Sequence, residues 1–566
     1  MTPRLPAAAI LLSLLPVGAM AERGAGGELR LLYWQAPTSL NPYLSSGPKD
    51  NEAASLILEP LARHDETGRL MPWLATHIPS RENGDISQDM TQVTWTLREG
   101  LLWSDGSPVT ADDVVFTARY CMDKETTCQQ AAKFADVTAV SALDAQRVQL
   151  EFATPKPYPF APFVGLESPI LQKAQFSDCI GSAAASCSEA NLRPIGTGPY
   201  RVTDMRAGDV ISFDMNPSFR DASKPGFATV TLKGGGDAVS AARAVLETGE
   251  FDYAWNLQVD PDILKTMQTG GKGMVISAMG TPVERLMINL TDPDATLGPT
   301  RSTRDGGAHP ILSDPRVTRA LSMAIDRRVA TELGYGPAGQ PACDLIAAPA
   351  IYVGSDGLDC LTQDLDGARA LLDDAGWVDS DGDGIRDKDG RALSLLFQTS
   401  INPVRQTLQD LIKAWWAEIG VETDLRAIEP SVFFGADQTS PDTFRKFFAD
   451  VQMYTNFFPG TDPEAYLNNW RCDAAPTPDN GWAGANIPRY CDPDYDALTQ
   501  KLAQTQDMEA RAAIVGQLND MLIEAGAIIP LVLRGRVSAR ANSLAGVKMN
   551  AWDSELWNIA DWTRTR

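Results

Sequence analysis

The sequence predicts a mixed α/β protein with more than one domain. Strand-like runs alternate with amphipathic helical patterns along most of its 566 residues. The clearest example passes from an apolar strand at 228–232 through a helix at 238–249 to a second strand at 251–255. A chain of this length is sufficient for two or three domains, each with its own core.

The chain begins with the features of an export signal. Arg4 precedes an apolar stretch at 7–15, and Ala19-Met20-Ala21 is typical of a cleavage site, so the predicted signal peptide covers residues 1–21. This segment is too short to remain as a membrane anchor. Because no cysteine follows the predicted cut, we expect no lipid anchor and a mature protein that is free in a bacterial periplasm.

The first half of the chain contains repeated strand and helix signals. Residues 28–34 have the pattern of a strand that ends before Pro42, and a helix with one apolar side is expected over 50–61. Residues 62–190 alternate short strands and helices, and strand character returns after residue 200.

The segment 95–116 predicts a strand, a turn and a helix. Residues 93–98 alternate between apolar and polar, as in a half-buried strand. A turn rich in Ser, Gly and Pro follows at 104–108. Thr110 then supplies a helix N-cap, with acidic residues in the first turn of the helix.

The second half contains two strong helix signals. Asp314 and Pro315 form an N-cap and first-turn pair for a helix whose apolar residues recur at helical spacing. Apolar residues over 408–419 predict another helix, which Gly420 ends before a strand at 421–425.

The eight cysteines fall into neighbouring couples. An even number in an exported chain favours disulfides, and short loops favour pairing between neighbours, although eight cysteines permit 105 connectivities. The expected pairs are Cys121 with Cys128, Cys179 with Cys187, Cys343 with Cys360, and Cys472 with Cys491. Zinc is disfavoured because CxxC spacing is absent and the chain has only three histidines.

The net charge of −24 limits the choice of partners. Such a surface repels phosphate backbones, so we expect no nucleic acid partner. Cationic and neutral solutes are compatible with it. The plainer interpretation is that the acidity keeps an exported protein soluble.

The sequence contains no recognised catalytic motif. It has no GxSxG, HExxH or Walker sequence, and its histidines are far apart. A secreted hydrolase that uses a carboxylate pair is therefore the weaker hypothesis.

One segment has the spacing of a calcium-binding loop. Asp379, Asp381, Asp383 and Asp387 occupy positions 1, 3, 5 and 9 of such a loop, and Ile385 would contribute its carbonyl oxygen. Position 12 is a glycine rather than the bidentate glutamate. The sequence therefore leaves two interpretations open: a structural Ca²⁺ site that stiffens the loop, or a plain Asp/Gly turn. No other cofactor is expected.

Five segments, in register over about 450 residues, resemble one family. They are 95–116, Arg193-Pro194-Ile195-Gly196-Thr197-Gly198-Pro199-Tyr200, Asp314-Pro315-Arg316-Val317 with Ala324-Ile325-Asp326-Arg327, Ala370 to Trp377, and Ile528-Ile529-Pro530-Leu531. The sequence is similar in these segments to the periplasmic solute-binding proteins of peptide-type ABC importers, the oligopeptide, dipeptide and nickel binders of family 5, cluster C.

The resemblance implies a bilobal type II periplasmic-binding-protein fold. Lobe I would comprise 28–60, 190–285 and 530–566, with an extra domain inserted at 61–189, and lobe II would comprise 286–529. The solute is expected between the lobes, which swing together about the crossing strands.

The resemblance also implies which residues bind the solute. Side chains after the first strand, near residue 255, and around the Asp462-Pro463 motif would line the pocket. Those places hold Trp34, Gln35, Trp255, Asn256, Tyr454, Asn456, Phe457, Trp470, Asn486, Arg489 and Tyr490. Aromatic rings offer large contact area with few rotatable bonds, and the arginine fork suits a carboxylate. Core packing is the alternative role for each tryptophan.

The sequence departs from the family at one position. Peptide binders of this family carry an Asp shortly before the Asp-Pro pair, where it meets the ammonium of the peptide, but here Pro459 takes its place. A buried ammonium needs a carboxylate partner. Either Glu59 or Asp462 supplies one, or the solute has no free amine.

We therefore expect a monomeric solute-binding protein of an ABC importer. It would capture a small peptide or related polar solute and deliver it to an inner-membrane permease complex. A sugar-like or opine-like solute is the alternative within the family, and nickel ranks lower because histidine is so scarce.

Overall fold

The structure is a computed structural model that describes residues 23–45, 47–353, 360–435, 437–458, 460–505 and 507–565. The predicted signal peptide and Pro459 lie outside these residues. Within the described part of the chain, no helix is both long and apolar enough to cross a membrane.

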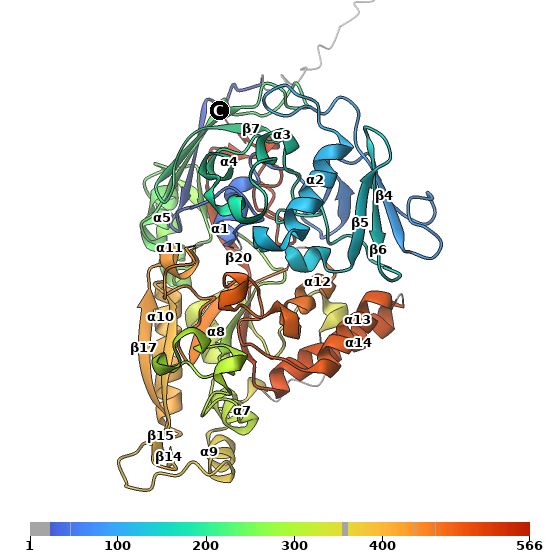
Figure 1. The fold of residues 1–566 in the computed structure, drawn as a ribbon. Coiled ribbons are helices and arrows are strands. Elements are labelled where there is room, and N and C mark those ends of the chain that lie inside the picture. The colour runs from blue at the N-terminus through green and yellow to red at the C-terminus, as the bar shows by residue number, and fades with distance from the viewer. Residues whose placement is uncertain are drawn as a thin grey trace, which may run out of the picture.

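Two separate sheets divide the molecule into an upper and a lower lobe (Figure 1). The first sheet has seven strands in the order β11-β20-β10-β1-β9-β8-β7. Its strands are β1 (Glu28–Tyr33), β7 (Tyr200–Arg206), β8 (Val210–Met215), β9 (Thr229–Gly234), β10 (Tyr253–Trp255), β11 (Gly273–Ala278) and β20 (Arg536–Ala541). Because β1 pairs in parallel with β9 and β10, the N-terminal strand lies at the centre of lobe I.

Helices cover this first sheet and connect its strands. α5 (Ala238–Leu246) lies between β9 and β10 in the chain and forms the predicted βαβ alternation with them, and it packs against α6 (Pro261–Gln268), which follows β10. α1 (Pro48–Ala54) follows β1. A small pair of strands, β21 (Leu544–Ala545) and β22 (Thr563–Arg564), lies close to the C-terminus.

An extra domain occupies the segment between β1 and β7. Its three-stranded sheet has the order β4-β6-β5. The elements are β2 (Ala62–His64), β3 (Leu70–Pro72), β4 (Gln92–Thr96), α2 (Ala111–Met122), β5 (Val137–Ala142), β6 (Arg147–Phe152), α3 (Lys173–Phe176) and α4 (Ser188–Leu192). The predicted strand, turn and helix of 95–116 are confirmed as β4 and α2, and the Asp113 carboxylate accepts a hydrogen bond from the backbone N–H of Thr110 at 2.9 Å.

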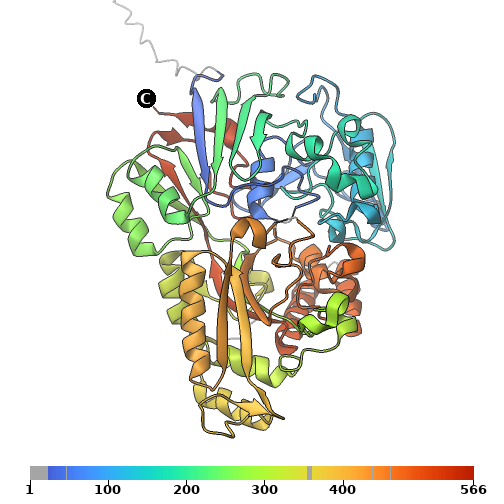
Figure 2. The ribbon, with the colours of Figure 1, turned by 60° about the vertical axis from the view of Figure 1, so that its left-hand side comes forward.

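The second sheet has six strands in the order β13-β19-β12-β18-β16-β17. They are β12 (Val283–Ile288), β13 (Gly339–Pro341), β16 (Ser394–Ser400), β17 (Glu422–Ile428), β18 (Val451–Asn456) and β19 (Ile528–Arg534). Its helices are α7 (Pro315–Met323), α8 (Arg327–Gly334), α9 (Leu365–Asp374), α10 (Pro403–Ala417), α11 (Pro430–Phe433), α12 (Glu464–Leu467), α13 (Pro493–Gln504) and α14 (Met508–Glu524). Figure 2 shows α10 along the strands of this sheet, and the hairpin β14 (Asp387–Lys388) with β15 (Arg391–Ala392) lies at the far end of the lobe.

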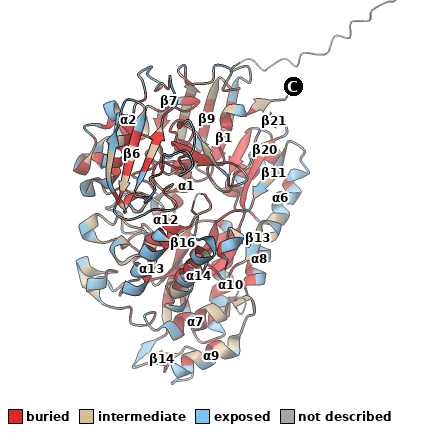
Figure 3. Ribbon diagram, turned by 90° about the vertical axis from the view of Figure 1, so that its right-hand side faces the viewer, coloured by how far each residue is buried: buried red, intermediate tan, exposed pale blue. Residues whose placement is uncertain are grey.

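The chain changes sheet twice, between β11 and β12 and again between β19 and β20. Residues 279–282 form the first crossing and Gly535 the second. The sequence places the boundaries at 285 and 530, whereas β12 and β19 each lie wholly in the second sheet. The buried strands of both sheets run toward the junction of the lobes (Figure 3).

The helix expected over 50–61 is shorter than predicted, because α1 ends at Ala54. The backbone carbonyls of the segment after it accept hydrogen bonds from the 193–200 motif instead: the carbonyl of Ile57 accepts one from the Gly198 N–H at 2.9 Å. A Cβ atom on Gly196 would lie 1.8 Å from the Ile57 oxygen. This close approach explains why glycine occupies the motif.

The four predicted disulfides are confirmed. Cys121–Cys128, Cys179–Cys187, Cys343–Cys360 and Cys472–Cys491 are all bonded, and they close loops of 7 to 19 residues. Each pair restricts a loop rather than joining the two lobes.

Candidate functional site

A cleft between the two lobes consists of three adjoining chambers. The central chamber has a volume of about 130 Å³, the hinge chamber about 70 Å³ and the outer chamber about 360 Å³. Phe434 lines all three, while Pro48 and Thr455 line both the central and the hinge chamber. Because these residues come from both lobes, a molecule that fills the cleft contacts both lobes.

The walls of the central chamber are largely aromatic. Tyr158 and Phe160 belong to the extra domain, and Phe444 and Tyr454 belong to lobe II, where their rings meet edge to face at 5.3 Å. Burial raises the pKa of Tyr454 to about 12, so its hydroxyl group remains protonated at neutral pH. The chamber therefore offers ring surfaces with polar edges, which suits an extended, partly apolar solute.

The hinge chamber is strongly charged. Six ionisable residues line it: Lys49, Glu52, Arg405, Arg534, Arg536 and Glu555. Arg405 pairs with Glu284 at 2.9 Å and Arg536 with Glu52 at 3.1 Å. The guanidinium of Arg536 also lies 4.4 Å from the ring centre of Phe457.

Two acids of this chamber are held close together in a buried position. Ser554 donates a hydrogen bond to Glu52 at 2.6 Å, and Tyr253 donates one to Glu555 at 2.6 Å. Desolvation raises the pKa of Glu52 to about 7, although the charge of Arg536 partly opposes this, and burial also raises the pKa of Glu555. The two acids titrate as a linked pair.

The structure brings six of the eleven predicted binding residues to the cleft. They are Gln35, Trp255, Asn256, Tyr454, Asn456 and Phe457. Trp255 stacks on Tyr33 with ring centres 4.8 Å apart, and the amide of Asn256 donates a hydrogen bond to Gln35 at 3.4 Å.

The other five predicted residues line none of the three chambers. Trp34 packs in the core of lobe I, and its indole N–H donates a hydrogen bond to the carbonyl of Asn256 at 2.7 Å. Trp470 lies edge to face against Tyr466, and Tyr490 against Tyr495. The aromatic character of a residue in the sequence therefore does not show whether it lines the cleft or packs in the core.

Asn486 and Arg489 hold the backbone of lobe II. The Asn486 amide donates a hydrogen bond to the carbonyl of Tyr490 at 2.6 Å. Arg489 donates hydrogen bonds to the carbonyls of Arg445 and Lys446 at 2.7 and 3.1 Å. Burial lowers the pKa of Arg489 to about 9. Both Nη atoms of its guanidinium donate to backbone carbonyls, and Arg489 lines none of the three chambers.

Both acids predicted to replace the missing aspartate already have partners within the protein. Glu59 accepts hydrogen bonds from Arg220 at 2.6 Å and from the Trp73 indole at 2.7 Å, and it lines no chamber. Asp462 does line the central chamber, but it pairs with Arg511 at 2.6 Å. A solute ammonium would therefore compete with an existing ion pair.

The sequence prediction missed the cationic residues of the hinge chamber and Phe434. A signal for them exists in the sequence, because Arg534 and Arg536 flank Gly535 directly after the apolar run 528–533. Charges at the end of such a strand are unusual unless they are paired or functional.

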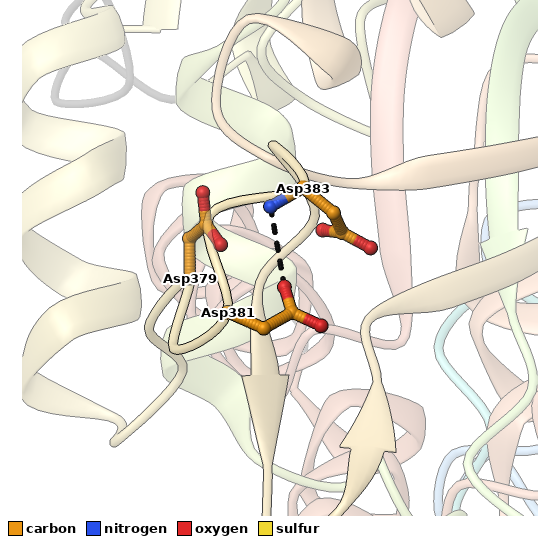
Figure 4. Close-up of side chains that lie close together, drawn as sticks. All are labelled: Asp379, Asp381 and Asp383. Carbon is orange, nitrogen blue, oxygen red and sulfur yellow. Dashed lines mark hydrogen bonds between the residues drawn. The ribbon is translucent and has the colours of Figure 1, made fainter.

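The candidate calcium loop lies far from the cleft, in the turn between α9 and β14 (Figure 1). The carboxylates of Asp379, Asp381 and Asp383 each offer an oxygen within 4.8 Å of the others (Figure 4). All three also accept hydrogen bonds from loop N–H groups, and Asp387 accepts from Ser380. This geometry is compatible with either interpretation of the loop.

Comparison with known proteins gives the same assignment over most of the chain. Residues 69–477 match the model of the bacterial extracellular solute-binding proteins, family 5. Protein XP55 of Streptomyces lividans is 30% identical over 379 residues, a match that covers 65% of this chain and 61% of that protein.

Solved structures of similar proteins share the fold. The oligopeptide-binding protein AppA from Bacillus subtilis, in complex with a nonapeptide, has a TM-score of 0.81 at 21% identity and covers 96% of this chain and all of that one. The protein AgaA from A. tumefaciens R10, in complex with agropinic acid, has a TM-score of 0.76 at 18% identity and covers 95% of this chain and 99% of that one. The bilobal fold expected from the sequence is confirmed, and the chain belongs to the family 5 bacterial extracellular solute-binding proteins.

Proposed function

We propose that this protein captures a small peptide or a related polar solute between its lobes and delivers it to the permease of an ABC importer. The observation that carries the proposal is the cleft at the junction of the lobes, whose walls come from lobe I, the extra domain and lobe II. A solute that touches both lobes favours the closed arrangement, whereas a solute that touches one lobe has no such effect.

The protein acts by binding and not by turnover. The residues that line the cleft include aromatic rings, amides and charged groups, among them the paired Arg405 and Arg536. Residues 1–21 would export it, and the mature chain would work in the periplasm without a lipid anchor. The AppA complex with a nonapeptide supports a peptide solute.

Two measurements test this function together. The chain is exported with its own residues 1–21, isolated without denaturation, and then unfolded, and the released material is identified by mass spectrometry. We expect an intact solute and reduced uptake of that solute in a deletion strain. Steady formation of cleavage products from the solute, or unchanged uptake after deletion, would contradict the proposal.

An opine-like or sugar-like acid is the second candidate within the same function. It is favoured by one specific observation: the carboxylates that line the central chamber, Glu167, Asp462 and Glu464, are each already paired with a lysine or arginine. A solute without a free amine would leave these pairs intact. The AgaA complex with agropinic acid supports this candidate.

A further inference from the structure

One cation of the hinge chamber differs from its neighbours. Arg534 is only 6% exposed, and its side chain makes a single hydrogen bond within the described part of the chain, from one Nη atom to the Asn256 amide oxygen at 2.7 Å. Its Nε atom is buried and has no hydrogen-bond partner among the described residues. Arg405 and Arg536 line the same chamber, but each has a carboxylate within 3.1 Å.

A buried guanidinium without an ion pair is costly, because desolvation of the charge is not repaid by a nearby anion. Glu284 pairs with Arg405 and Glu555 is held by hydrogen bonds from Tyr253 and Ser538, so the two nearby acids are already engaged. The linked acids Glu52 and Glu555 retain a proton near neutral pH more readily than ordinary glutamates. The chamber thus has positive charge in excess, within a protein whose net charge is −24.

The backbone next to Arg534 supports a role in binding. Asn256, which receives its hydrogen bond, has a φ of 55°, in the left-handed region that is uncommon for residues other than glycine and costs asparagine less than most of them. The amide of Asn256 thereby lies between Arg534 and Gln35. Strain of this kind persists where the surroundings require it, often at ligand sites.

On this basis we infer that Arg534 is the anchor for a carboxylate of the solute. The assignment rests on the proposed function and makes it more specific: the solute is an acid whose carboxylate lies in the hinge chamber. A guanidinium binds a carboxylate through two parallel hydrogen bonds, and its unpartnered nitrogen atoms leave that geometry open. The body of the solute extends past Thr455 and Phe457 into the central chamber.

The position of Arg534 links this anchor to lobe closure. It is the last residue of β19, directly before the crossing at Gly535. A carboxylate held there contacts the crossing strand itself, in a chamber that Trp255 of lobe I and Thr455 of lobe II also line. Two sources share this chemistry, the C-terminal carboxylate of a peptide and the carboxylate of a sugar acid or opine.

Matched pairs of probes distinguish these sources. Titration calorimetry on the whole mature protein compares trialanine with trialanine amide, and gluconate with gluconamide. We expect the acid of one pair to bind at least tenfold more tightly than its amide, and the pair identifies the source. Arg534→Gln should lower the affinity for the acid by about 30- to 100-fold and abolish the preference for the acid over the amide.

Two controls keep the result interpretable. Arg540→Gln changes another arginine, on β20, which donates to a backbone carbonyl and lines no chamber, so binding should stay unchanged. The melting temperature of Arg534→Gln should stay close to that of the parent, because removal of a buried charge that has no ion pair among the described residues offsets the loss of the Asn256 hydrogen bond and of the contact with the Tyr335 ring at 5.8 Å. A purely structural arginine would show the opposite pattern, with lower stability and an unchanged ratio of acid to amide affinity.

The results that would contradict the carboxylate anchor differ from those that would contradict the proposed binding function. Equal affinity for acid and amide, a preference that survives in Arg534→Gln, or a retained solute without an acidic group overturns the anchor and leaves the binding function standing. If neither pair binds, the solute released from the isolated protein serves as the probe for the variants. Absence of any bound solute, with unchanged uptake after deletion, overturns the function and the anchor with it.

Discussion

Phe434 is the residue at which the three chambers of the cleft meet. Its ring is partly exposed and lies edge to face against Phe433 and Tyr454, at 4.8 and 6.3 Å. Trp34 has a different role, because it is 5% exposed and packs inside lobe I. A substitution at Phe434 therefore tests the binding surface, and a substitution at Trp34 tests the core.

Alanine substitutions at these two positions should give opposite results. Phe434→Ala removes a wall shared by all three chambers, so affinity for the solute should fall by about tenfold or more. Trp34→Ala creates a core cavity and should lower the free energy of unfolding by about 3 to 5 kcal/mol with little effect on the affinity of folded protein. Calorimetry and urea unfolding provide the two readouts. Equal losses of affinity in both variants would contradict the chamber assignment.

The buried acid Glu52 predicts a specific dependence of stability on pH. Its pKa of about 7 in the folded protein lies above its ordinary value of 4.5, so the folded state binds more protons between these values. Stability contributed by the protonated acid is therefore complete below pH 4.5 and lost as the pH rises through 7. The loss amounts to about 3 kcal/mol at most.

The comparison of Glu52→Gln with the parent protein isolates this effect. The free energy of unfolding of the parent, relative to the variant, should fall between pH 5 and pH 8. Glu509→Gln, at an exposed position of α14, serves as the control and should show no such trend. A difference between parent and Glu52→Gln that stays constant over this range would show that Glu52 is not responsible.

At the scale of elements, the loop between α9 and β14 predicts two distinguishable outcomes. If the loop holds Ca²⁺, millimolar calcium should raise the melting temperature, EDTA should reverse the rise, and Asp381→Asn should remove it. If it is a plain turn stabilised by its own hydrogen bonds, calcium should have no effect. Scanning fluorimetry with magnesium as a parallel control decides between the two interpretations.

At the scale of the whole molecule, contacts across the cleft hold the lobes together. Lys156 of the extra domain pairs with Glu464 of α12 in lobe II and also with Asp136 at 2.6 Å. Gln258 of lobe I likewise accepts a hydrogen bond from Asn402 of lobe II. These contacts stabilise the closed arrangement even before a solute contributes.

Removal of the Lys156 contact should shift the balance between open and closed lobes. In Lys156→Met, the radius of gyration without solute should increase, and solute affinity should fall by about tenfold or less because the closed form is less populated. Lys173→Met removes an exposed pair with Asp112 within the extra domain and is the matched control. Identical small-angle scattering curves for parent and Lys156→Met would rule out a role in closure.

The sequence by itself determined the local elements, the disulfide pairs and the family. Helix caps such as Asp314 and turns such as 104–108 act over a few residues, so their patterns are visible in the chain. The short separation between cysteines likewise limits each pair to its neighbour. Motifs in a constant order then indicated two lobes with an inserted domain.

Only the tertiary structure decided which side chains face the solute. Trp34 directly follows β1 and Trp255 ends the neighbouring strand β10; both are buried, yet only Trp255 lines the hinge chamber. The helix expected over 50–61 is cut short because the distant segment 193–200 takes its carbonyl groups. Within the hinge chamber, Arg534 differs from Arg405 and Arg536 in having no ion pair among the described residues, and only the tertiary structure sets that difference. Burial and pairing depend on residues hundreds of positions apart, and a local pattern does not contain that information.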